Sequence, residues 1–216
     1  IDEGASYQRH WAFEPVADQQ LPRVRDSAWP SQSMDHFILA KLEQVELTPA
    51  KRASRRTLIR RAYLDLVGLP PSPQEVADFL ADDSGDAFAN VVDQLLESPQ
   101  YGERWARHWL DVARYAEDQA HTFKARRYPH GHRYRDWVVR SLNADMPYDE
   151  FIRNQVAADL VGDASDRHDR LAALGFFAMG PVYYQDNGEK AKALADEWDD
   201  RVDTLTRGLL GVTVSC

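Results

Sequence analysis

The sequence predicts an all-α protein, an irregular bundle of about eight or nine helices that follows an extended N-terminal arm. Apolar residues recur at spacings of three and four along most of the chain, which is the period that places them on one face of a helix. Glycine, proline and serine separate these stretches, and no strand-type alternation continues for more than about four residues. The pattern therefore favours helices joined by short links.

The composition is that of a folded globular domain. Of 216 residues, 44% are hydrophobic and 28% are charged, and six Trp, nine Tyr and eight Phe supply large side chains for a core. The formal net charge of −9 argues against a general nucleic-acid binder, which needs a basic surface. No apolar run approaches the roughly 18 residues of a membrane span, so we expect none.

Residues 1–30 are predicted to form the extended arm, a linker from an upstream domain, and residues 31–216 a helical domain. The arm has no helical period, and its prolines favour extended backbone. We expect the arm to be held on the protein surface by its aromatic residues, Trp11, Phe13 and Trp29.

The helices are predicted in chain order from their apolar stripes and end signals. They run from about Ser33 to Val45, from Ser54 to Gly68, from Ser72 through Leu80, from Asp86 to Leu96, from Tyr101 to Tyr115, from Arg133 to Asn143, from Pro147 to Leu160 and from Asp169 to Met179, with a long last helix after a loop at Gly180–Gly188. Two apolar sets each share one helix face: Phe37, Ile38, Leu42 and Val45; and Trp105, Trp109 and Val112. Three further sets are expected to face inward: Phe88, Val91, Val92, Leu95 and Leu96; Tyr148, Phe151, Ile152, Val156 and Leu160; and Leu194, Trp198, Val202, Leu205 and Leu209.

The third helix has the clearest start signal. Ser72 and Glu75 flank Pro73 as a capping box, in which each of the two side chains accepts a hydrogen bond from the backbone N–H of the other residue. Gly68, followed by Pro70, marks the end of the preceding helix.

Residues 116–131 interrupt the helical pattern and are predicted to form a functional loop, because so long a loop is uncommon in a compact domain. Its histidines, His121, His130 and His132, are candidate ligands of a transition metal, since imidazole suits several such ions. The alternative is that they are ordinary polar surface. The basic residues of the same region could instead hold an anionic group; they are Lys124, Arg126, Arg127, Arg133 and Arg135.

His108 is a further candidate ligand or base. Helix geometry places Arg104, His108 and Asp111 on one side, so the carboxylate could orient the imidazole and fix its tautomer. The alternative is a buried polar network that joins helices.

The last helix carries a cluster of carboxylates that share a face, as acid–base work or a divalent cation would require. They are Asp196, Asp199, Asp200 and Asp203, with Glu197 beside them. The alternative is a salt-bridged or solvated face, because Arg201 and Arg207 lie near in sequence.

The sequence carries none of the common nucleotide-binding, hydrolase or zinc-protease motifs. The single cysteine, Cys216, is the last residue, which excludes an internal disulfide. We expect it to begin a motif that continues beyond the chain, so that the helical domain is truncated at its C-terminal end.

Residues 101–115, YGERWARHWLDVARY, resemble the signature of a domain family of unknown function that is abundant in planctomycetes. Its members occur in long exported proteins associated with cytochrome c. Other segments resemble the family in the same order: residues 1–5, 10–13, 64–71, 134–138, 146–149, 201–203 and 210–214.

The resemblance implies a haem c cofactor. In the family, the segment that starts at this cysteine reads as a C-x-x-C-H motif, so Cys216 would be the first haem-linking cysteine and His108, which matches the signature, a candidate axial ligand. It also implies a periplasmic or extracytoplasmic location. The implied partners are an upstream cytochrome-like domain, a downstream domain of unknown function and a redox partner.

Three functions follow as alternatives. The first is a helical module of an exported cytochrome-c-type protein that supports haem binding and electron transfer. The second is a structural docking module without a cofactor, which predicts an exposed apolar patch. The third is a component that hydrolyses or cleaves acidic carbohydrate with the carboxylates of residues 196–203.

Overall fold

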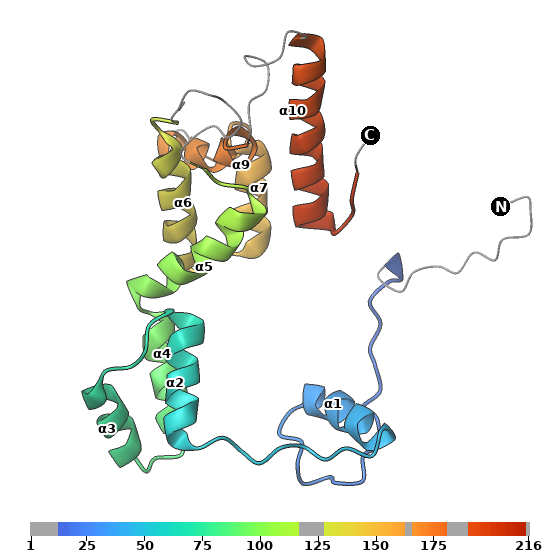
Figure 1. The fold of residues 1–216 in the computed structure, drawn as a ribbon, viewed down its shortest axis with the longest axis vertical. Helices are drawn as coiled ribbons and strands as arrows, with labels where there is room; N and C mark the ends of the chain where they lie inside the picture. The colour runs from blue at the N-terminus through green and yellow to red at the C-terminus, as the bar shows by residue number, and fades with distance from the viewer. Residues whose placement is uncertain (1–12, 117–127, 163–165, 181–189, 215–216) are drawn as a thin grey trace, which may run out of the picture. The chain divides into compact units, whose positions relative to one another are not determined.

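The computed structural model describes residues 13–116, 128–162, 166–180 and 190–214 (Figure 1). Every regular element in these ranges is helical and no strand occurs there, so the predicted all-α class is confirmed. The chain divides into two compact units, residues 1–53 and residues 54–216. No described helix is both long and apolar enough to cross a membrane.

The helical elements follow the predicted order. They are α1 (Ser33–Gln44), α2 (Arg55–Leu66), α3 (Pro73–Ala81), α4 (Ala87–Leu96), α5 (Pro99–Val112), α6 (Gly131–Asn143), α7 (Tyr148–Ala157), α8 (Arg167–Arg170), the 3₁₀ turn η2 (Leu171–Leu174), α9 (Gly175–Ala178), α10 (Lys190–Leu205) and the π-helical turn η3 (Thr206–Leu210). The helix predicted from Asp169 to Met179 is broken into three short elements, α8, η2 and α9, and α6 begins two residues earlier than predicted.

In the first unit, the arm is held by a carboxylate. Glu43 of α1 accepts hydrogen bonds from the backbone N–H of Arg25, at 2.9 Å, and of Asp26, at 3.2 Å. The N–H groups of Arg25 and Asp26 lower the pKa of the Glu43 carboxyl. Phe13 and Trp29 are exposed and Trp11 lies outside the described residues, so the aromatic anchoring of the arm stays a prediction.

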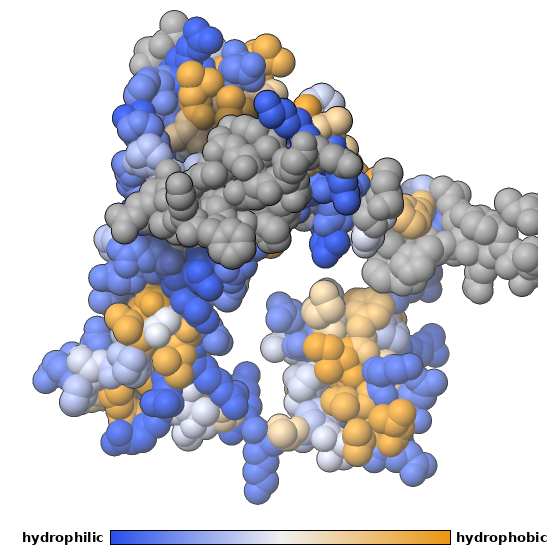
Figure 2. Space-filling view, turned by 45° about the horizontal axis from the view of Figure 1, so that its top comes forward, coloured by the Kyte–Doolittle hydropathy of each residue, from blue (hydrophilic) through white to orange (hydrophobic). Residues whose placement is uncertain are grey.

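The apolar stripe of α1 lies at the surface of this unit instead of facing inward. Phe37, Ile38 and Val45 are exposed, and the only fully buried residue of this helix is Leu39. Figure 2 shows hydrophobic side chains gathered on the surface of this unit. One short helix and an arm offer too little partner surface to cover the stripe.

In the second unit, α2, α3 and α4 share one apolar cluster centred on Ile59, Tyr63 and Phe79. The predicted capping box is confirmed, with Ser72 N–H donating to Glu75 at 2.6 Å and Glu75 N–H to Ser72 Oγ at 3.3 Å. Burial, together with a hydrogen bond to Glu75, raises the pKa of Tyr63 to about 12. The cap thus joins the start of α3 to α2.

A second cluster contains α5, α6, α7, η2 and α9, and its most extensive contact is between α5 and α6. The core face of α5 consists of Gly102, Ala106 and Leu110, and not of the predicted Trp105 and Val112, which are both exposed. Small residues let the two backbones come close. Trp109 alone of the predicted stripe packs on this core, with its ring centroid 4.9 Å from that of Phe151.

The inward stripe predicted for α7 is only partly correct. Phe151 is buried and Ile152 packs beside it, but Tyr148, Val156 and Leu160 are exposed. The remaining core positions of this helix are filled by polar side chains, Asn154 and Gln155. The spacing of apolar residues does not predict such a face, because its buried residues are polar amides that form hydrogen bonds inside the protein.

The inward stripe predicted for α10 is wrong for most of its length. Leu194, Trp198 and Val202 are exposed, whereas Leu205 packs against the second cluster. The buried residues of α10 are Ala193, Glu197 and Thr204. Two of the three are polar, so this helix also presents a partly polar face to the core.

Gly102 is expected to be intolerant of any side chain. A Cβ at this position would lie 2.6 Å from the Val139 carbonyl oxygen and 2.5 Å from Asn143 Oδ1, so Gly102→Ala must push α6 away from α5. We expect a loss of about 1–3 kcal/mol in the free energy of unfolding, measured by urea denaturation. Gly85→Ala is the matched control, because a Cβ there meets nothing within 4 Å. Equal stability of the two variants would contradict the close contact.

Candidate functional site

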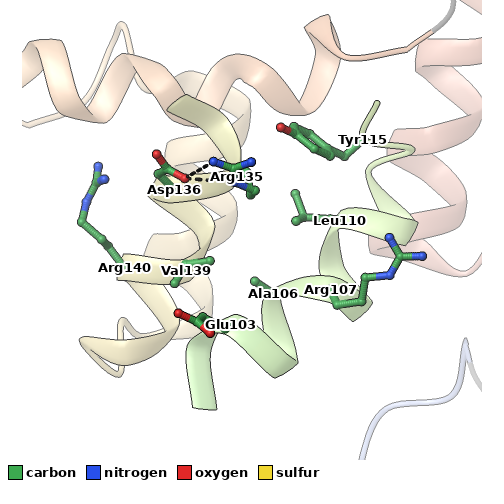
Figure 3. A pocket seen from close by; sticks show the side chains of 9 residues that line it. All are labelled: Glu103, Ala106, Arg107, Leu110, Tyr115, Arg135, Asp136, Val139 and Arg140. Atoms are coloured by element: carbon green, nitrogen blue, oxygen red, sulfur yellow. Dashed lines mark hydrogen bonds and ion pairs between the residues drawn. The ribbon is translucent and has the colours of Figure 1, made fainter. Parts of the chain in front are cut away.

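A groove of about 670 Å³ lies between α5 and α6 (Figure 3). Its α5 wall is formed by residues 103, 106, 107 and 110, which share one face of the helix at spacings of three and four. Its α6 wall is formed by residues 135, 136, 139 and 140, and Tyr115 contributes after the end of α5. All of these residues belong to the described part of the chain.

Two hydrogen bonds between the Asn143 side chain and the backbone of α5 set the spacing of these walls. The Gly102 N–H donates to Asn143 Oδ1 at 2.8 Å, and Asn143 Nδ2 donates to the Pro99 carbonyl oxygen at 3.1 Å. The end of α6 therefore satisfies groups in the first turn of α5, which is where a helix leaves N–H groups unpaired. The groove begins one residue after this junction, at Glu103.

The floor of the groove is apolar and its rim is charged. Ala106, Leu110 and Val139 form the apolar part. The rim holds three arginines, each paired with a carboxylate: Arg107 with Asp111 at 3.2 Å, Arg135 with Asp136 at 3.0 Å, and Arg140 with Asp169 at 2.5 Å. Such a groove can bind a ligand by apolar contact and by guanidinium hydrogen bonds.

The lining contains no histidine, cysteine, serine, threonine or methionine. It thus offers neither an ordinary nucleophile nor an imidazole base. The groove is a candidate binding site, and its lining places Glu103, Asp136 and Tyr115 beside three arginines.

A buried polar network lies beside the groove, where α5, α6 and α7 meet. Gln155 Oε1 accepts from Trp109 Nε1 at 2.7 Å and from the Tyr134 hydroxyl at 2.8 Å, and its Nε2 donates to the Phe151 carbonyl oxygen at 3.1 Å. Burial raises the pKa of Tyr134, which keeps the hydroxyl protonated as a donor. From the sequence, a buried polar network that joins helices was expected as an alternative around His108, and not around Gln155.

His108 is exposed and does not form the predicted pair with Asp111. Asp111 binds Arg107, one helical turn earlier, and no hydrogen bond joins it to His108 in the described residues. The imidazole instead lies edge-on to Trp105, with ring centroids 5.5 Å apart. Arg107 lies four residues before Asp111, a spacing that favours an ion pair along a helix.

The loop histidines are not brought together by the described structure. His130 precedes α6 and His132 lies in its first turn, and both are exposed, while His121 lies outside the described residues. Within the described ranges, no three His, Cys, Asp or Glu side chains are grouped so that they could hold a metal ion. The metal site at His108, His121, His130 and His132 therefore stays a prediction.

The carboxylates of α10 are largely paired with arginines. Glu197 lies 3.7 Å from Arg201, Asp203 lies 2.7 Å from Arg207, and Asp200 forms an ion pair with Arg114 from the end of α5. The alternative of a salt-bridged face thus describes most of this helix. Arg114 was not predicted as a partner, because no local spacing indicates a pair so distant in sequence.

Haem c does not fit the groove. A c-type haem needs an axial ligand such as histidine or methionine beside an apolar pocket, and the groove lining has neither residue. His108 lies on the other side of α5 from residues 103, 106, 107 and 110, because successive helical residues are separated by about 100°. Cys216 lies outside the described residues, so the proposed attachment point is not tested.

Residues 33–216 match a protein family described as PSCyt2, protein of unknown function (DUF1549). Comparison with curated proteins and with solved structures finds no match. The match covers all of the helices described above, from α1 to η3.

Gln155 is expected to be the shared acceptor of the buried network. Gln155→Leu leaves the Tyr134 hydroxyl without its acceptor, so we expect a loss of about 1–3 kcal/mol in the free energy of unfolding. Tyr134→Phe should lower the free energy of unfolding by a smaller amount. The double variant should lose less than the sum of the two single losses, because both single changes remove the same hydrogen bond. Urea denaturation of the four proteins measures the coupling, with exposed Gln94→Leu as the control. Strictly additive losses would contradict a shared network.

Proposed function

The chain belongs to the PSCyt2 family of proteins of unknown function, and we propose that it is a helical docking module of an exported cytochrome-c-type multidomain protein. In this proposal its main task is to hold neighbouring domains of the same polypeptide. The supporting observation is the apolar face of α10, and the multidomain, extracytoplasmic setting is taken from the sequence resemblance.

The apolar face of α10 consists of Leu194, Trp198 and Val202, which follow one another at a spacing of four. Their exposed fractions are 47%, 63% and 45%. Single exposed apolar residues are common on monomers, but large side chains on successive turns form a continuous stripe, as at surfaces that contact another protein. The stripe is the best-defined candidate interface of the second unit.

The opposite side of α10 contacts other parts of the second unit. Arg114, which follows α5, forms an ion pair with Asp200. Gly208 in η3 lies so close to Val112 that a Cβ would come within 2.9 Å of its Cγ1. A rigid apolar stripe loses little conformational entropy when a partner binds.

The partner is expected to be an amphipathic helix. Its apolar face could lie on the stripe formed by Leu194, Trp198 and Val202. Such a helix in a neighbouring domain of the same polypeptide is the proposed occupant.

We also propose haem c attachment at Cys216, with electron transfer to a redox partner as the task of the complete protein. This rests on the resemblance of residues 101–115 and 210–214 to the family, in which a C-x-x-C-H motif follows. His108 is exposed, so an iron carried by another domain could reach it. The groove between α5 and α6 has no part in this proposal.

Docking predicts that α10 is covered in the multidomain protein. Hydroxyl-radical labelling read by mass spectrometry should be several-fold slower at Leu194 and Trp198 in that protein than in the 216-residue chain. Trp198→Ser should restore labelling of Leu194, whereas Leu160→Ser, which removes another exposed apolar residue, should not. Identical labelling of α10 in both proteins would rule out docking through this face.

Haem attachment predicts a haem thioether on Cys216. The multidomain protein, made in a host that matures c-type cytochromes, should give a pyridine haemochrome spectrum and a peptide mass with haem at this residue. Cys216→Ser should lose that adduct. His108→Ala should shift the Soret band if this imidazole binds the iron. A colourless protein with a free thiol at Cys216 would exclude haem attachment at this site.

A further inference from the structure

We propose that the groove between α5 and α6 binds an organic monocation, in which an apolar ring is joined by a short chain to a primary ammonium group. This ligand site goes beyond docking, because it uses other helices and another kind of partner. Its success or failure is therefore independent of α10 and of haem.

The charges around the groove leave one carboxylate without a partner. Each of the three arginines that line the groove is neutralised by an aspartate: Arg107 by Asp111, Arg135 by Asp136, and Arg140 by Asp169. Glu103 also lines the groove, is exposed, and pairs with no basic side chain of the described residues. Three guanidinium groups thus face four carboxylates, and the excess negative charge belongs to Glu103. This charge favours a cation as the ligand.

The arginines leave the interior of the groove open to such a ligand. The guanidinium groups of Arg107 and Arg140 point away from the groove in opposite directions, and each is paired with an aspartate outside it (Figure 3). Arg135 is bound to Asp136 of the same helix at 3.0 Å, so its charge is balanced within the α6 wall. A ligand in the groove therefore meets an apolar floor with one uncompensated negative charge at its end.

The floor of the groove suits a ring and a chain. Leu110 and Val139 face each other from α5 and α6, Tyr115 lies beside Leu110, and Glu103 lies at the opposite end (Figure 3). Glu103 and Leu110 are two helical turns apart, about 10 Å along the axis, with the small side chain of Ala106 between them. An aromatic ring packed on Leu110 and Tyr115 can thus place an ammonium group beside Glu103 through a chain of about four carbons.

The volume of the groove agrees with a ligand of this kind. It is about 670 Å³, within the roughly 300–1,000 Å³ typical of small-molecule sites. A ring with a four-carbon chain fills part of this space and leaves room for water around the ammonium group. The pair with Glu103 is therefore partly solvated, and its contribution to affinity is modest.

The experiment is a titration of the 216-residue chain with 4-phenylbutylammonium, observed by NMR of the labelled Leu and Val methyl groups. We expect saturable shifts of the Leu110 and Val139 methyls, which line the groove. The neutral alcohol, 4-phenylbutanol, should bind about fivefold more weakly, because it lacks the charge that pairs with Glu103. Butylammonium, which has the charge without the ring, should produce no saturable shift over the same concentrations.

The role of the carboxylate is tested with a matched control. Glu103→Gln should bind the amine and the alcohol equally, with the alcohol bound as tightly as by the unaltered chain. Glu97→Gln should keep the fivefold preference for the amine, because Glu97 is also an exposed glutamate but lies outside the groove, at the end of α4. Both side chains are exposed, so both variants are expected to fold.

Several outcomes would overturn the proposal. One is the absence of saturable shifts at Leu110 and Val139 in the unaltered chain, a result that needs no variant. Another is equal affinity of the unaltered chain for the amine and the alcohol. A third is a loss of amine affinity in Glu97→Gln as large as in Glu103→Gln, because that would show general attraction to the net charge of −9.

Discussion

The close approach of α5 and α6 is the constraint on which the second apolar cluster depends. Gly102 and Ala106 present almost no side chain to α6, so the backbones can come close enough for Asn143 to bind the first turn of α5. The same small residues leave no bulk to fill the space farther along the two helices. A tight junction at one end and a groove beside it thus have a common origin in residue size.

Buried polar groups determine which faces of α7 and α10 turn inward. Gln155 occupies a core position because Trp109 and Tyr134 supply two donors to it, and together they link three helices. On α10 the core side carries Glu197 and Thr204 in place of large apolar residues. Such positions are stable only while their hydrogen bonds or ion pairs are made, and they make helix orientation specific in a way that apolar contact does not.

This explains how much could be predicted from the sequence. Helix positions were found well, because caps such as Ser72 with Glu75 and breaks such as Gly68 act locally. Helix orientation was predicted less well, because an apolar stripe is expected to turn inward, whereas here Trp198 is exposed and Gln155 is buried. The candidate groove was not predicted at all. Its lining combines residues of two helices, and no local spacing in either one indicates the other.

The exposed stripe of α10 follows from the same physics as the errors in prediction. A helix has a limited circumference, so polar residues on its core side displace its large apolar residues toward solvent. Had the stripe of Trp198 packed inward, Glu197 and Asp200 would have turned outward and lost their place beside the core. The sequence instead places the ion pairs against the core and leaves the apolar surface available. In an isolated domain the exposed stripe contributes no hydrophobic stabilisation. A partner that covers the stripe would remove this apolar surface from water and so stabilise the complex.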